Sequence, residues 1–193
     1  MYTIENKVSE KAYSFVGETE IKGNKGFKNP IFWKLMNSVG FKVNDPWCMY
    51  FVELVWSKVY EELGAKEVVE KYSKIFSASA TKTWRNFKKI KHPMGYTPKK
   101  GAIAIFQTYK KGVPFWTGHG VIVKDIEGLT IQTVEGNTRK NVMDRDGGSV
   151  CEKEYRNYES LFHVINGLRL LGFIYLNEYS HDEKIKKLSA YSY

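Results

Sequence analysis

The stretch DPWCMYFVELVW, residues 45–56, carries the strongest fold signal in the chain. Asp45-Pro46 is typical of a helix start and Gly64 of a helix end, so we expect a helix from about Pro46 to Leu63. Apolar side chains recur at one-turn spacing and share a face with Cys48: Phe51, Val52, Val55 and Val59. Cys48 is therefore expected in the first turn of a core-packed helix, with its sulfur directed toward the body of the domain.

Helical patterns surround this segment, and strand patterns follow it. We expect further helices over about residues 8–15, 31–39 and 65–75. Strands are expected over about residues 102–108, 120–125, 129–135, 149–155 and 170–176, with turn signals at 127–128 and 146–148. Helices first and strands afterwards predict an α+β domain, with N-terminal helices packed on an antiparallel β-sheet.

Length and composition indicate one folded domain. The chain has 193 residues, of which 42% are hydrophobic and 26% charged, values typical of globular proteins. We expect a single domain over residues 1–176 and a polar C-terminal tail over 177–193. The two cysteines, Cys48 and Cys151, are too few for a disulfide scaffold, and one bridge between them would block Cys48.

The first 17 residues do not have the pattern of a signal peptide. They carry charges at Glu5, Lys7, Glu10 and Lys11 and contain no apolar core. No stretch approaches the roughly 20 apolar residues that span a bilayer. We therefore expect synthesis in the cytoplasm without a signal peptide, and no membrane span.

Cys48 is a candidate nucleophile because of its expected place at a helix N-terminus. Such a terminus carries about half a positive charge, which lowers a thiol pKa. Its free N–H groups can also bind the oxyanion that forms when an amide carbonyl is attacked. A small buried core cysteine is the alternative that this position alone leaves open.

His119 is a candidate general base. It stands in GHGVIV, residues 118–123, where the flanking glycines let other backbone or a substrate come close and a strand would fix the ring. Taken alone, a surface histidine in a hairpin loop fits the same pattern. The other histidines, His92, His163 and His181, lack this setting.

Glu135 and Asn137 are candidates for the group that orients His119. They lie two residues apart in TVEGNTR, residues 133–139, and are expected to share one face of a strand. Either could accept the imidazole N–H. A carboxylate would also raise the pKa of His119, and we favour Glu135 as the direct partner. A strand end followed by a turn explains the same residues without chemistry.

Taken together, these residues give a cysteine on a helix, a histidine on a later strand, and a glutamate and an asparagine on the next strand. The sequence resembles the CHAP family of papain-like amidohydrolases, which are related to the NlpC/P60 enzymes, and especially its small versions in phage lysins and wall-processing proteins. The matching segments, in the family's order, are residues 12–20, 46–56, 97–106, 118–123, 134–139, 147–156 and 172–176. Ala102 and Gly120 depart from the family pattern, and neither is expected to react.

The resemblance implies a papain-like α+β fold and a cysteine peptidase or amidase that acts on peptidoglycan. It implies Cys48 as nucleophile, His119 as general base and acid, and Glu135 and Asn137 as orienting groups. The bond could be the N-acetylmuramoyl-L-alanine amide or one within the stem or cross-bridge peptides. A phage-lysin-like protein would reach the bacterial cell wall after release or as a virion component. A non-catalytic virion structural or wall-binding module of the same fold is the alternative.

No cofactor and no metal are expected. Some relatives hold calcium ahead of the cysteine, but only Asn44 and Asp45 precede Pro46 here, which is too few oxygens for Ca²⁺. A zinc site that combines Cys48, Cys151 and histidines lacks a ligand pair with diagnostic spacing.

The net charge of +9 predicts attraction to anionic polymers. Aromatic residues at 84, 87 and 96 alternate with seven basic residues between positions 81 and 100, of which the first five form the expected patch. The basic residues are Lys82, Arg85, Lys88, Lys89, Lys91, Lys99 and Lys100. Anionic wall polymers fit this patch as partners, and a solvated helix face explains it without any partner. Single-stranded nucleic acid also suits basic and aromatic side chains, but no nucleic-acid-binding motif accompanies them.

Overall fold

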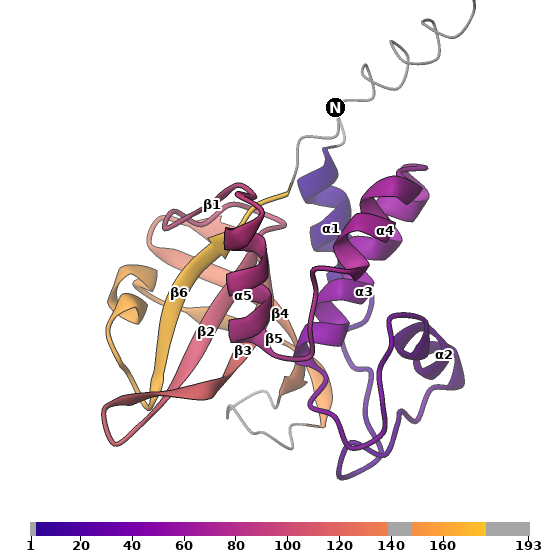
Figure 1. Ribbon diagram of the computed structural model, residues 1–193, viewed down its shortest axis with the longest axis horizontal. Helices are drawn as coiled ribbons and strands as arrows, with labels where there is room; N and C mark the ends of the chain where they lie inside the picture. The colour runs from indigo at the N-terminus through magenta and orange to yellow at the C-terminus, as the bar shows by residue number, and fades with distance from the viewer. Residues whose placement is uncertain (1–2, 139–147, 177–193) are drawn as a thin grey trace, which may run out of the picture.

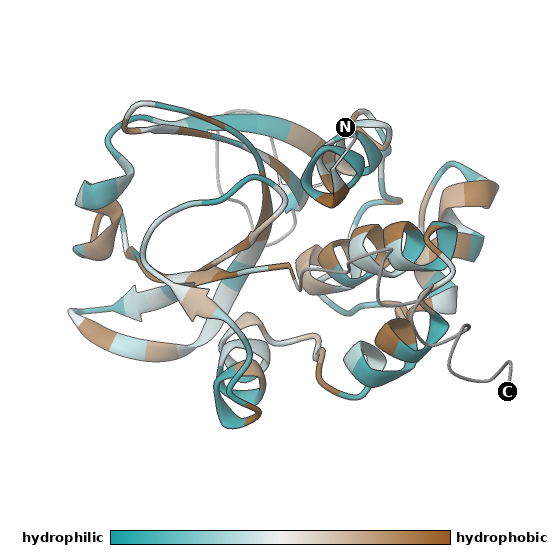
Figure 2. Ribbon diagram, turned by 90° about the horizontal axis from the view of Figure 1, so that it is seen from above, coloured by the Kyte–Doolittle hydropathy of each residue, from teal (hydrophilic) through white to brown (hydrophobic). Residues whose placement is uncertain are grey.

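The computed structural model describes residues 3–138 and 148–176, and within them helices pack against a six-stranded antiparallel sheet. The helices are α1 (Ile4–Tyr13), α2 (Pro30–Ser38), α3 (Cys48–Glu62), α4 (Lys66–Ser73) and α5 (Ala80–Lys89). In Figure 1, α1 to α4 lie to one side of the sheet and α5 crosses its face. Seen from above in Figure 2, the sheet curls back on itself. The α+β class expected from the sequence is confirmed.

The sheet has the strand order β1-β6-β2-β3-β4-β5. The strands are β1 (Met94–Gly95), β2 (Ile103–Lys110), β3 (Val113–Glu127), β4 (Thr130–Thr138), β5 (Ser149–Tyr155) and β6 (Leu168–Ile174), and a 3₁₀ turn, η1 (Tyr158–Phe162), precedes β6. Strands β2 and β3 form a hairpin whose two turn residues, Lys111 and Gly112, have φ values of 51° and 76°. Positive φ at both positions is the type I′ pattern, which matches the natural twist of a hairpin.

The sheet separates two hydrophobic cores. Ile103 and Ile105 of β2 join the helices in the larger core, whereas Ala104 and Phe106 belong to a smaller core on the other face, as strand alternation requires. Helix α3 is the centre of the larger core and is buried on nearly every side. Among the described residues, no helix is both long and apolar enough to cross a membrane.

All the predicted helices and strands are present, but some of their bounds differ and two elements were not predicted. The predicted strand over residues 149–155 is reproduced as β5, and the helix around Cys48 begins two residues later than expected. Helix α5 and strand β1 were not predicted, and β3 begins at Val113 rather than near residue 120. The proposed tail, 177–193, and most of the turn signal at 146–148 lie outside the described residues.

Candidate active site

Cys48 is the first residue of α3, and its neighbours fix where the helix begins. Trp47, the N-cap residue, is fully buried, and its indole Nε1 donates to Glu20 Oε2 at 2.6 Å. A Cβ atom on Gly136 of β4 would lie 2.6 Å from the Trp47 ring and 2.7 Å from Phe51 Cβ. The missing side chain of Gly136 therefore lets the start of α3 sit directly against β4, with the N–H groups of its first turn lacking partners in the helix.

His119 lies in β3, paired with Phe106 of β2. The glycines on both sides stand where a side chain has no room. A Cβ atom on Gly118 would collide with the Phe106 carbonyl oxygen, and one on Gly120 with Met49 Sδ. The close approach that the sequence predicted at these glycines is thus made by β2 on one side and by α3 on the other.

Glu135 of β4 is fully buried and surrounded by donors. His119 Nε2 lies 3.0 Å from Oε2, and Lys153 Nζ lies 3.4 Å from the same oxygen. Thr133 and Tyr155 donate their hydroxyl groups to Oε1 at 2.8 and 2.7 Å. Burial alone would raise the pKa of Glu135, but His119, Lys153 and Tyr155 lower it to about 2. The buried group is therefore a carboxylate, and it makes the contact with His119 that the sequence favoured.

Asn137 has different surroundings from Glu135. Its backbone is left-handed, with φ at 57°, a conformation that non-glycine residues rarely adopt. The alternation expected from the spacing of the two residues is interrupted there. Asn137 Oδ1 and the neighbouring Thr138 Oγ1 are buried without a hydrogen-bond partner in the described structure, and both residues line a pocket beside Cys48. Asn137 therefore faces the pocket, whereas Glu135 faces His119.

Cys48 and His119 form a coupled acid–base pair. Burial alone would raise the pKa of the Cys48 thiol, but a hydrogen bond and the charge of His119, with the backbone N–H groups of Gly120 and Met49, lower it. Burial alone would lower the pKa of His119, but hydrogen bonds and charges of Cys48 and Glu135 raise it to about 10. The thiolate and the imidazolium therefore stabilise each other near neutral pH.

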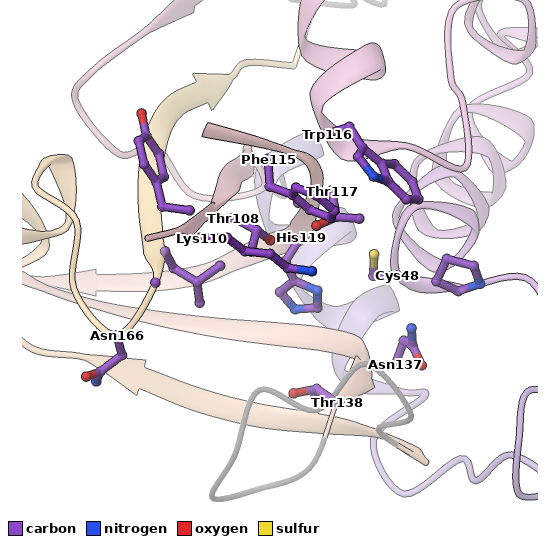
Figure 3. Close-up of a pocket in the computed structure, with 15 residues that line it drawn as sticks. Cys48, Thr108, Lys110, Phe115, Trp116, Thr117, His119, Asn137, Thr138 and Asn166 are labelled. Carbon is purple, nitrogen blue, oxygen red and sulfur yellow. The ribbon is translucent and has the colours of Figure 1, made fainter. Parts of the chain in front are cut away.

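The pocket in front of this pair has a volume of about 470 Å³. It extends from Cys48 and His119 along the β2–β3 hairpin to Lys110 and to the loop at Asn166. Figure 3 shows Trp116 at the upper rim near Cys48, with Asn137 and Thr138 on the opposite wall. A cavity of this size accommodates a small molecule or a short peptide.

The family model for the CHAP domain matches residues 40–137, about half of the chain. This chain belongs to the CHAP family. No curated protein and no solved structure matches it. CHAP domains in general are hydrolases of the amidase or peptidase type that act on peptidoglycan. The matched segment contains the four predicted site residues, and the structure brings all four to one pocket and the wall behind it.

The CHAP match ends before β5, which supplies two contacts of Glu135 that sequence reasoning missed. Alternation along Ser149–Tyr155 places Lys153 and Tyr155 on one face of the strand. The register against β4, in which Lys153 lies opposite Thr133, turns this face toward the carboxylate. The alternation along β5 is visible in the sequence, but the register of β5 against β4 is not.

The second cysteine lies close to the CHAP site but is not bonded to Cys48. Both cysteines are free. Cys151 lies opposite Glu135 in the β4–β5 pairing, and its Sγ lies 3.1 Å from Ser149 Oγ. Among residues 3–138 and 148–176, no group of three or more His, Cys, Asp or Glu side chains is arranged to hold a metal ion.

The other histidines have no part in this site within the described residues. His92 is buried, and its Nε2 lies 2.7 Å from the Tyr175 carbonyl oxygen, a contact that ties the end of α5 to the segment after β6. His163 is exposed at the end of η1. His181 lies outside the described residues.

Proposed function

We propose that this CHAP domain hydrolyses amide bonds of peptidoglycan with Cys48 as the nucleophile. The observation that carries the proposal is the arrangement of Cys48 and His119 on one pocket of peptide size, with Glu135 hydrogen-bonded to His119 behind it. A nucleophile, a base and a group that orients the base are the parts that covalent acyl transfer requires.

In the first half-reaction, Cys48 Sγ attacks the amide carbonyl carbon and forms an S–C bond. The C–N bond breaks as His119 gives its proton to the leaving amine, and a thioester remains. Glu135 holds the ring through Nε2, which leaves Nδ1 for the exchange with the thiol. The negative charge on the carbonyl oxygen is stabilised by the N–H groups at the start of α3.

In the second half-reaction, His119 takes a proton from water, and the hydroxide attacks the thioester. The S–C bond breaks, a carboxylic acid leaves, and the thiolate–imidazolium pair is restored. Asn137 is assigned to the pocket wall, where its amide contacts the substrate rather than the ring of His119, because it lines the pocket with an unpartnered oxygen. Glu135 keeps its charge throughout, since its pKa lies near 2.

The target is the N-acetylmuramoyl-L-alanine amide or an amide within the stem or cross-bridge peptides. We further propose a phage-lysin-like role, in which the protein acts on the bacterial cell wall after release or as a virion component. The resemblance of its motifs to the small CHAP domains of phage lysins supports this role. Anionic wall polymers are proposed as additional partners of the exposed basic residues of α5.

The test is digestion of purified peptidoglycan, with mass spectrometry to identify the new chemical termini. Wild type should release fragments with one new amine and one new carboxylate per cut. Cys48→Ser and Cys48→Ala should release none, while their free energy of unfolding stays within about 2 kcal/mol of wild type because the change in volume is small.

Cys151→Ser is the matched control, because it alters the chain's other free thiol, which does not line the pocket. It should retain most of the activity. Equal release by wild type and Cys48→Ala would overturn the cysteine mechanism. A wild type that binds walls without cutting them would favour the non-catalytic wall-binding module.

A further inference from the structure

The pocket beside Cys48 is electrically one-sided. None of the described residues that line it is Asp or Glu, and Lys110 carries the full positive charge outside the Cys48–His119 pair. Glu135 is behind His119 and does not line the pocket. Within residues 3–138 and 148–176, a ligand in the pocket therefore meets a positive group at the hairpin end and no acidic side chain in the pocket lining.

Lys110 is held in place but is left without a counter-ion. Its Nζ lies 3.9 Å from the ring centroid of Phe115, and among the described residues no carboxylate lies within ion-pair distance. In Figure 3 the side chain extends past Phe115 toward His119. An aromatic ring limits where the ammonium can go but does not neutralise it, so its charge remains available to an anion.

The other end of the pocket carries unpartnered polar atoms. Asn137 Oδ1 and Thr138 Oγ1 are buried and have no hydrogen-bond partner within the described residues, although both residues line the pocket. A buried polar group without a partner is costly, and a ligand that supplies the missing hydrogen bond removes that cost. The Cys48 end thus fits the N–H groups of a peptide, and the Lys110 end fits an anion.

The register of β2 sets the distance between the two ends. Phe106 lies opposite His119, and Lys110 lies four residues further along β2. At about 3.3 Å per residue this is roughly 13 Å of strand, which the length of the lysine side chain shortens. The anion would therefore lie about two to four extended residues from the amide under attack.

We propose that this pocket selects peptides whose free carboxylate pairs with Lys110 while their amide is presented to Cys48. The substrate class is an acidic peptide amide, and a peptide with a carboxamide at the same place is a poorer substrate. The proposal rests on the proposed function for the cleavage, but the pairing of Lys110 with a carboxylate can be measured without cleavage.

The test uses two short peptides that carry an N-terminal chloroacetyl group and differ only in a C-terminal carboxylate or carboxamide. Cys48 Sγ displaces chloride and forms a stable thioether, so the rate of adduct formation reports binding in the pocket without peptidoglycan. Wild type should react with the carboxylate peptide about threefold to fivefold faster, the range that an exposed ion pair supports. The preference should fall with added salt.

Lys110→Met should bring the ratio of the two rates close to one, Lys110→Arg should keep it, and Lys110→Glu should invert it. Lys111→Met is the matched control: it removes the same charge from the next residue, which does not line the pocket, and should leave the ratio as in wild type. Neutral iodoacetamide measures the reactivity of the thiol in each variant, and the ratio of the two peptide rates is independent of any change in that reactivity.

A wild-type ratio of one, or an equal ratio in Lys110→Met and wild type, would overturn the carboxylate site. Failure of the proposed function gives a different result: the ratio of the two peptide rates would change in the Lys110 variants, but peptidoglycan would not be cut. If peptidoglycan is cut but the ratio of the two peptide rates is the same in wild type and in the Lys110 variants, the catalytic proposal stands and this inference is wrong.

Discussion

The two oxygens of the Glu135 carboxylate have separate partners. Oε2 faces the cations His119 and Lys153, whereas Oε1 accepts from the hydroxyl groups of Thr133 and Tyr155. The side chain thus supplies both an orientation, through its hydrogen bonds, and a charge. Substitutions that keep the shape but remove the charge can separate these two contributions.

Glu135→Gln keeps the shape and removes the charge. Turnover should fall by about 10²- to 10⁴-fold, as in other sites that lose the carboxylate behind a histidine. In wild type the imidazolium is present below the pKa of His119, which is about 10. Loss of the carboxylate lowers that pKa. The alkaline limb of kcat/KM should therefore move to lower pH. This is measured as a pH–rate profile on a soluble peptide substrate.

Asn137→Ala is the comparison for this prediction. Asn137 faces the pocket and has no part in the charge of the imidazolium, so the variant should lose less activity and keep the alkaline limb in place. The reverse pattern, with the limb moved by Asn137→Ala and not by Glu135→Gln, would assign the orienting role to Asn137.

Lys153→Met should move the same limb in the other direction. Lys153 shares Oε2 with His119 and partly offsets the charge of the carboxylate. Without Lys153, the full negative charge of Glu135 acts on the imidazolium of His119. The pKa of His119 therefore rises, and the alkaline limb moves to higher pH. A simple packing role for Lys153 would lower stability but leave the limb where it is.

Lys124→Met is the matched control for Lys153→Met. Lys124 lies on β3 and pairs with Glu152 of β5, whereas Lys153 lies on β5 and contacts Glu135. Lys124→Met therefore removes an equal charge without touching the Glu135 carboxylate. Its pH–rate profile should overlay that of wild type. A shift of the same size in both variants would mean that net charge, and not the contact with Glu135, moves the limb.

At the scale of elements, the close packing of the start of α3 against β4 depends on Gly136, which has no side chain. Gly136→Ala places a Cβ atom against Trp47 and Phe51 at less than 3 Å, and neither buried ring can withdraw freely. The start of α3 should move, with a loss of about 1–3 kcal/mol in the free energy of unfolding, typical of overpacking. The rate at which iodoacetamide alkylates Cys48 should fall, because the thiol moves relative to His119.

Gly148→Ala is the control for this change. Gly148 adjoins β5, and a Cβ atom there would lie 3.5 Å from Glu20 Cγ, an ordinary contact. The alkylation rate should remain that of wild type. If Gly136→Ala alkylates as fast as wild type at equal stability, the glycine is not what positions the nucleophile.

The sequence analysis found the helices and strands whose buried residues form a regular apolar repeat, and it missed or shortened others. Helix α3 is buried on nearly every side, so its apolar spacing and its Gly64 stop were visible. Helix α5 is clearly amphipathic, with Ala80, Thr81, Thr83 and Phe87 buried and its basic residues exposed. The sequence analysis interpreted those basic residues only as a charged patch and so missed the helix. The first part of β3 is largely exposed and is held by pairing with β2, so no alternation marks it.

The site divides in the same way. Cys48, His119 and Glu135 were predictable because a helix start, a glycine-flanked strand and a nearby carboxylate are local patterns. The left-handed backbone at Asn137 and the arrival of Lys153 are not local, since they depend on strand register and on what packs across the sheet. The pocket end at Lys110 depends on the hairpin turn at Lys111, which the sequence analysis did not assign.

At the scale of the whole molecule, the proposed binding to anionic wall polymers should depend on net charge and on where the basic residues lie. The net charge is +9, and α5 carries four exposed basic residues and no acidic ones: Lys82, Arg85, Lys88 and Lys89. Screening at physiological salt limits the reach of each charge to about 8 Å, so charges gathered on one helix act together only on a polymer close to that face. Binding to whole walls should weaken as salt rises, while cleavage of a short neutral peptide should change little.

Two quadruple variants separate the α5 face from the total charge. One replaces Lys82, Arg85, Lys88 and Lys89 by Gln, and the other replaces Lys22, Lys25, Lys28 and Lys42, which are equally exposed but lie near α2 and the chain before α3. Both remove the same charge. If the α5 face binds wall polymer, the first variant should bind walls several-fold more weakly and with a smaller salt dependence, and the second should resemble wild type. Equal losses would make the net charge responsible, and tighter binding to single-stranded DNA than to wall fragments would favour nucleic acid as the partner of this face.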